Sequence, residues 1–333
     1  MARHGEQAMA RGAAAAARPD AALGRGGGRR RSRERTMVPE ADFRSYYGQP
    51  VLKQPVWHEP NMPLYLYLGG VSGASATLAA AAQLTGRRRL SLAGRLVAAV
   101  SGAAGAALLA AELGRPGRFL NMLRIFRPTS PMSMGSWILA AHGGLTAAAA
   151  GSAVTGLLPA AGDAAGLAAL VTGPLMATYT AVLVSDTAVP AWHEARRELP
   201  FLFAGGALAG AGALAMLTVP RADAAPARTI AATGAALETV AGQALERRLG
   251  MLAEPYRTGS AGRLMRAARL LTAVGGALAP LAGRHRALTA VSALSLTAGA
   301  VCTRFGVLRA GRASAADPRY TVVPQRERLG QAR

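Results

Sequence analysis

Long runs of apolar residues recur along the chain, and each has about the 20 residues that an α-helix needs to cross the ~30 Å hydrocarbon core of a bilayer. The runs alternate with short polar connections that carry arginine and proline. Hydropathy predicts eight spans, at residues 62–84, 91–112, 133–158, 165–189, 200–219, 227–246, 265–282 and 287–308. The sixth span is the weakest, because it contains Glu238, Gln243 and Glu246. The pattern predicts an all-α, polytopic membrane protein with eight transmembrane helices.

The chain before the first span has two parts. Residues 1–36 are a low-complexity tail rich in Ala, Gly and Arg, a composition that cannot bury a core, so we expect this tail to be disordered. Met37 begins a more ordinary sequence and is an alternative start of the protein. Residues 37–60 then form a pre-membrane segment.

The basic residues bear on partners and on topology. The net charge is +21, but the arginines lie in the tails or at the ends of apolar runs, so we expect no nucleic-acid partner. Eight spans place both termini on one side, and that side has 30 of the 38 basic residues. The positive-inside rule therefore predicts that the termini are cytoplasmic. When only the short loops are counted, the side of the termini has 12 basic residues and the opposite side has 8, which is a smaller difference.

Cysteine and histidine limit the cofactors that this chain can hold. The single cysteine, Cys302, excludes an internal disulfide and a Cys-ligated iron–sulfur or zinc site. His142 is the only histidine within a confident span, so no pair of histidines is available to ligate a buried haem. We expect neither haem nor metal in this chain.

The connection between the second and third spans, "LGRPGRFLNMLRIFRPTSPMSMGSW", is unusually rich in large and charged side chains. Its apolar residues recur at the spacing of one helix face, which predicts a short interfacial helix over 115–127; they are Phe119, Met122, Leu123 and Phe126. Pro128 ends this helix. Ser130 is expected to cap the next helix, with Pro131 at its first position.

Polar residues cluster where spans one and four reach the side of the termini. His58 and Asn61 precede or begin the first span, and Tyr65 lies one turn further on. Tyr179 and Asp186 share one face of the fourth span. Hydrogen-bond donors and a carboxylate at the edge of the hydrocarbon core suit a quinone headgroup, because its carbonyl oxygens accept hydrogen bonds and its reduction requires protons. The alternative is an aromatic belt with Asp186 exposed at the interface.

The segments "SYYGQPVLKQPVW", "PLYLYLGGVSGAS", "LGRPGRFLNMLRIFRPTSPMSMGSW" and "TYTAVLVSDTAVPAW" resemble the NrfD/PsrC family, the membrane subunits of polysulfide-reductase-type complexes. The resemblance is strongest over residues 40–200. It implies two four-helix bundles without haem, which we place at 61–189 and 190–308, followed by a C-terminal tail at 309–333. Asn61 and Tyr179 match family quinone-site positions. The family histidine one turn after the asparagine has no counterpart, and His58 precedes Asn61 instead.

The resemblance implies a quinone-reactive membrane anchor in the plasma membrane, binding menaquinone or ubiquinone. Such a subunit exchanges electrons with a four-cluster iron–sulfur subunit that serves a molybdenum or tungsten catalytic subunit. It does not act on the terminal substrate by itself. The predicted quinone site consists of Asn61, His58, Tyr65, Tyr179 and Asp186.

Two other sets of charged residues complete the prediction. We expect four arginines of the connection to contact the iron–sulfur subunit or lipid phosphates: Arg115, Arg118, Arg124 and Arg127. One alternative function is proton or ion translocation along Glu112, Asp186 and Glu238. Another is an inert membrane anchor.

Overall fold

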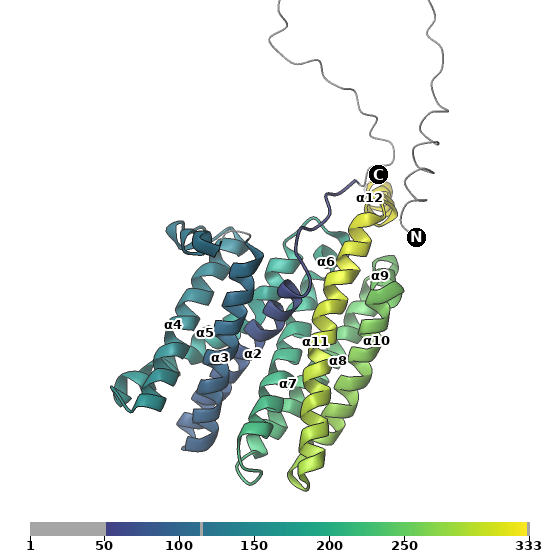
Figure 1. The fold of residues 1–333 in the computed structure, drawn as a ribbon. Coiled ribbons are helices and arrows are strands. Elements are labelled where there is room, and N and C mark those ends of the chain that lie inside the picture. The colour runs from purple at the N-terminus through teal and green to yellow at the C-terminus, as the bar shows by residue number, and fades with distance from the viewer. Residues whose placement is uncertain (1–50, 114–115, 332–333) are drawn as a thin grey trace, which may run out of the picture. The chain divides into compact units, whose positions relative to one another are not determined.

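A computed structural model describes residues 51–113 and 116–331, without the side chains of residues 116, 118–120 and 328–331. In this part of the chain there is no strand, and eight helices have at least 20 residues (Figure 1). They are α2 (Asn61–Leu84), α3 (Arg88–Glu112), α4 (Pro131–Thr155), α5 (Pro159–Ser185), α7 (Leu199–Thr218), α8 (Ala225–Arg248), α10 (Gly259–Leu278) and α11 (Arg286–Ala316). The predicted tail at 1–36 and the alternative start at Met37 lie outside the described residues.

The eight long helices match the eight predicted apolar runs in order and approximate position. Among the described residues, seven of them are long and apolar enough to cross a membrane. The eighth, α8, is the run that the sequence already marked as the weakest, since it carries Glu238 and Glu246. The prediction of an all-α, multi-pass membrane protein is confirmed.

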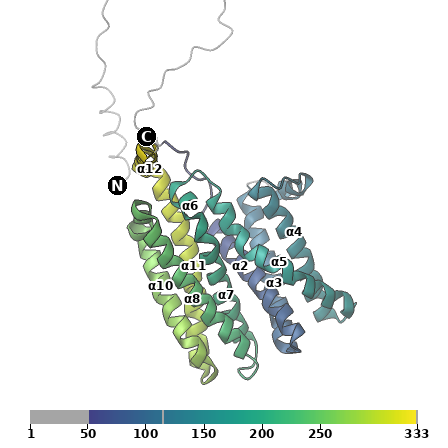
Figure 2. The ribbon, with the colours of Figure 1, turned by 180° about the vertical axis from the view of Figure 1, so that it is seen from behind.

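The helices pack as two four-helix groups. In the first, α2 packs on α3 and α5, and α4 packs on α3 and α5. In the second, α7 packs on α8 and α11, and α10 packs on α8 and α11. Helices α2 and α5 also contact α7, which joins the groups, and the views in Figures 1 and 2 show the eight helices side by side.

Small residues set the distance between neighbouring helices. A Cβ atom at Gly73 of α2 would lie only 2.3 Å from the carbonyl oxygen of Gly173 in α5, so the two backbones touch there. A Cβ atom at Gly206 of α7 would lie 2.8 Å from Nη1 of Arg304, so this glycine leaves room for a guanidinium group. Gly73 ends the motif Gly69-x-x-x-Gly73 and Gly206 begins the motif Gly206-x-x-x-Gly210; such small-xxx-small motifs permit close approaches.

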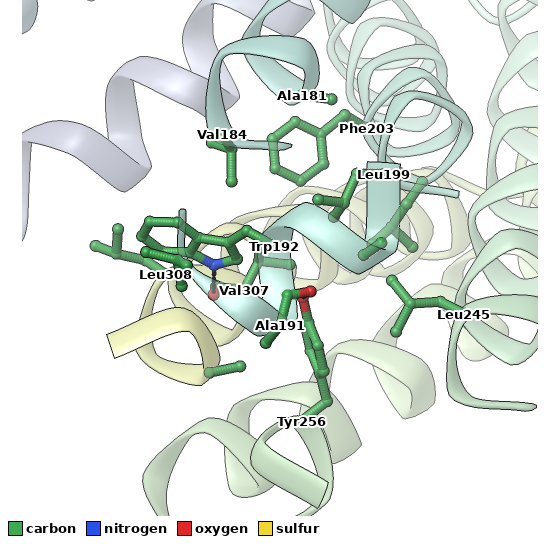
Figure 3. Packing of buried hydrophobic residues seen from close by; sticks show 14 of the residues in the cluster. Ala181, Val184, Ala191, Trp192, Leu199, Phe203, Leu245, Tyr256, Val307 and Leu308 are labelled. Atoms are coloured by element: carbon green, nitrogen blue, oxygen red, sulfur yellow. Dashed lines mark hydrogen bonds between the residues drawn. The ribbon is translucent and has the colours of Figure 1, made fainter. Parts of the chain in front are cut away.

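A buried aromatic cluster lies at one end of the second group, where the short helix α6 (Pro190–Glu194) follows α5 (Figure 3). The Trp192 side chain is fully buried, and its Nε1 donates a hydrogen bond to the carbonyl of Val307 at 2.7 Å. The Tyr256 hydroxyl donates to the carbonyl of Ala191 at 3.0 Å. Trp192 also stacks on Trp57 with ring centroids 5.3 Å apart. The cluster therefore holds the segment before α2 against α6 and α11.

The last long helix is longer than its apolar run. Helix α11 continues to Ala316, past the predicted end of the span at residue 308, and α12 (Arg319–Gln331) follows it. Pro318 lies two residues beyond Ala316, and because the residue before a proline is disfavoured in a helix, α11 ends there. As a result Arg309 and Arg312, which lie beyond the predicted span, are helical residues.

Candidate functional site

A cavity of about 400 Å³ lies at the end of the first group where α2 begins, α3 ends, α4 begins and α5 ends. The segment before α2 and the connection after α3 complete its wall. We call it the headgroup cavity; it is lined by Val56, Trp57, His58, Met62, Tyr65, Leu109, Glu112, Leu113, Met122, Met132, Gly135, Ser136, Tyr179 and Leu183. The structure thus brings together the three segments that the sequence placed on one side of the membrane.

Two tyrosines form part of the cavity wall. Tyr65 of α2 is 1% exposed, and its buried hydroxyl has no hydrogen-bond partner among the described residues. Tyr179 of α5 is buried with its ring against Gly135 of α4, where a Cβ atom would lie 2.3 Å from a ring carbon. Glycine at position 135 therefore allows the Tyr179 ring to reach this wall. A buried polar atom without a partner is costly, which marks the Tyr65 hydroxyl as a donor available to a ligand.

Glu112 and His58, an acid–histidine pair, line the same cavity as the two tyrosines. Oε1 of Glu112, the last residue of α3, accepts a hydrogen bond from the backbone N–H of His58 at 2.6 Å and lies 3.1 Å from its Nδ1. The Glu112 side chain is only 10% exposed, and its Oε2 atom is buried without a partner in the described residues. The sequence listed Glu112 only as a proton-path candidate, whereas the structure makes it a cavity residue.

The segment before α2 is also bound to the far end of the chain. Nε of Arg309 donates to Oε1 of Glu59 at 3.0 Å, and its Nη2 donates to Oε2 at 2.6 Å. Arg312 donates to the same carboxylate and to the carbonyl of Trp57. The hydrogen bond from Arg309 holds the pKa of Glu59 below its usual value. Residues 57–59 are therefore fixed between α3 on one side and α11 on the other.

Two predicted site residues do not line the headgroup cavity. Asn61 is the half-buried first residue of α2, one turn before Tyr65, and it is not among the lining residues. Asp186 is exposed at the C-terminal cap of α5, because the helix ends at Ser185. This position matches the alternative of an exposed interfacial carboxylate.

The third acidic candidate, Glu238, belongs to a separate cluster in the second group. It is 4% exposed; its Oε1 accepts a hydrogen bond from Thr303 at 2.7 Å, and its Oε2 accepts one from Thr272 at 3.4 Å. Nη1 of the fully buried Arg304 lies 3.9 Å from Oε1. Sequence reasoning did not identify Arg304 as the partner of Glu238, because the two residues lie on different helices and no local spacing links them.

The connection after α3 differs from the predicted interfacial α-helix. It forms a 3₁₀-helix, η1 (Pro116–Arg124), which has three residues per turn and therefore does not maintain the predicted α-helical face. Phe126 lies beyond its end, is exposed, and packs edge-on against Trp137 at 5.9 Å. Met122 reaches the headgroup cavity. The predicted cap is confirmed, since Ser130 Oγ accepts the N–H of Ser133 and Pro131 begins α4.

The predicted docking arginines are only partly described. Arg124 and Arg127 are exposed beside the headgroup cavity end of α4. Arg115 lies outside the described residues, and the side chain of Arg118 is not described, nor is that of Phe119. Within the described ranges no group of three or more His, Cys, Asp or Glu residues has the arrangement of a metal site.

Two comparisons with known proteins complete the description. Residues 49–237, more than half of the chain, match the family described as polysulphide reductase, NrfD. This range includes the whole headgroup cavity. Comparison with curated proteins found no match to the chain.

Proposed function

The chain belongs to the NrfD family of membrane proteins, and from this premise we propose that it is the quinone-reactive anchor subunit of an oxidoreductase complex. In this proposal it passes electrons between a membrane quinone, menaquinone or ubiquinone, and an iron–sulfur partner subunit. The partner in turn serves a molybdenum or tungsten catalytic subunit, which alone acts on the terminal substrate. The complex resides in the plasma membrane.

The observation that carries the proposal is a pair of unpartnered polar atoms in one mostly apolar cavity. The Tyr65 hydroxyl can donate a hydrogen bond, and Oε2 of Glu112 can accept one. A quinone presents carbonyl oxygens that accept hydrogen bonds, and the quinol presents hydroxyls that donate them. The two atoms therefore fit both redox states of a quinone ring, and the apolar lining suits the ring itself.

The residues around Glu112 suit a role in proton transfer. A quinone takes up two electrons and two protons when it is reduced to the quinol. Glu112 holds one oxygen toward His58, and its Oε2 has no partner among the described residues, so it can accept a proton from a bound hydroxyl at Oε2. His58 is largely exposed and can pass a proton between Glu112 and water.

The position of the cavity suits contact with redox partners. It lies at the helix ends, beside the exposed Arg124 and Arg127, which can pair with acidic groups of an iron–sulfur subunit or with lipid phosphates. Because Glu112, Asp186 and Glu238 lie in three separate settings, we favour electron transfer over ion translocation as the main function.

Replacing Tyr65 with Phe should weaken quinone binding, since the ring carbonyl loses a donor. A hydrogen bond worth about 0.5–1.5 kcal/mol predicts a ~2- to 13-fold rise in Kd. The measurement is quenching of tryptophan fluorescence by menadione in the purified protein, because Trp57 lines the cavity.

The matched control is Tyr67→Phe, which removes a buried hydroxyl from the same helix outside the cavity lining. Its Kd for menadione should equal that of the unaltered protein. If the Tyr65 and Tyr67 variants bind menadione with equal affinity, Tyr65 does not contact the quinone.

A further inference from the structure

A second hollow adjoins the headgroup cavity and runs away from it along the first group of helices. It has a volume of about 220 Å³ and lies between α3 and α4 beneath η1. We call it the α3–α4 groove; it is lined by Ala99, Gly102, Ala103, Ala106, Met122, Leu123, Ser136, Leu139, Ala140, Gly143, Gly144, Thr146 and Ala147. Met122 and Ser136 line both the groove and the cavity, so the two hollows are adjacent.

The helix periodicity shows that the groove continues the cavity wall. On α3 the groove residues Gly102 and Ala106 are followed at helical spacing by Leu109 of the cavity, and then by Leu113 directly after the helix. On α4 a single face runs from Met132 in the cavity to Ala147 in the groove. From Ser136 to Ala147 this face is about 16 Å long at the ~1.5 Å rise per residue of an α-helix.

The groove presents hydrocarbon and almost nothing else. Its two polar residues use their hydroxyls within α4: Ser136 donates to the carbonyl of Met132 at 2.9 Å, and Thr146 donates to that of His142 at 2.8 Å. Most of the other lining residues are alanine or glycine, which leave space beside the two backbones. A Cβ atom at Gly143 or Gly144 would meet nothing within 4 Å.

We propose that the α3–α4 groove binds the isoprenoid tail of the quinone whose ring occupies the headgroup cavity. This inference rests on the proposed function. A tail attached to the ring has to leave the cavity along an apolar surface. The groove adjoins the cavity at Met122 and Ser136, and its described lining residues offer no free polar group. The tail then lies along α3 and α4 beneath Met122 and Leu123 of η1.

Gly143→Leu tests the proposal by filling the groove at a point remote from the headgroup cavity. The added side chain enters open space, so it displaces a ligand and not a neighbouring helix. The expected result is about a tenfold weaker binding of a long-tailed menaquinone, through lost tail contacts. Binding of menadione, which has the same ring and no tail, should be unchanged.

The matched control is Gly151→Leu, which makes the same change on the exposed part of α4, where a Cβ atom also meets nothing within 4 Å. It should bind both quinones as the unaltered protein does. Unchanged binding of the long-tailed quinone by Gly143→Leu would overturn the tail site, and so would an equal loss for both quinones. If menadione binds neither the unaltered protein nor the control, the proposed function itself fails.

Discussion

Glu112→Gln is expected to lower quinone-dependent turnover of the assembled complex by about 100-fold or more, the usual effect of removing a general acid or base. The amide oxygen of glutamine can still accept hydrogen bonds from the His58 backbone N–H and ring, so the local geometry survives. Its NH₂ group cannot take up a proton at the position of Oε2. Turnover with a quinol donor or quinone acceptor, measured in membranes, provides the test.

Binding and turnover should separate in this variant. Menadione affinity should change little, since the cavity keeps its size and its Tyr65 donor. The control is Asp186→Asn at the exposed end of α5, which should leave turnover unchanged. Normal turnover in Glu112→Gln, or a large loss in Asp186→Asn, would contradict the assignment of Glu112 as the proton-accepting residue.

Arg304→Met should destabilise the fold by about 3–5 kcal/mol, the range for removing one partner of a buried ion pair. Arg304 is fully buried, donates to the carbonyl of Phe203 at 2.8 Å, and stacks over the Phe203 ring. Without it, the buried Glu238 carboxylate loses the one cation that pairs with it among the described residues. The free energy of unfolding in detergent measures the effect.

A double variant separates the charge from the packing. Glu238→Gln combined with Arg304→Met leaves no unbalanced buried charge, so it should recover much of the lost stability. Arg263→Met, on the exposed face of α10, is the control and should stay within about 0.5 kcal/mol of the unaltered protein. If the double variant is as unstable as Arg304→Met, the ion pair is not the stabilising feature.

The fold could be predicted from the sequence because apolar runs of spanning length leave few other structures open. Even the weakness of α8 was visible in its two glutamates. The end of α11 was not visible, because the apolar run ends at residue 308 while the helix continues to Ala316. The local signal for the true end was Pro318, which hydropathy does not record.

The site could be predicted as a region but only partly as a set of residues. Helix counting placed His58, Tyr65 and Tyr179 at one end of the first group, and the structure brings these three together with Glu112 in one cavity. The contact of Glu59 with Arg309 joins residues 250 positions apart, and no periodicity predicts such a pair. For Asp186 the periodicity gave a wrong prediction. Helix spacing placed it on the same face as Tyr179, but α5 ends at Ser185, one residue before it.

Light-activated crosslinking of an azido-naphthoquinone, followed by peptide mapping, tests the central claim most directly, namely that a quinone ring binds in the headgroup cavity. The predicted result is labelling of peptides that contain residues 56–65, 109–113 and 179–183, with excess menaquinone competing for the label. Labelling confined to peptides of α8, α10 and α11, or labelling that menaquinone does not reduce, would contradict the account.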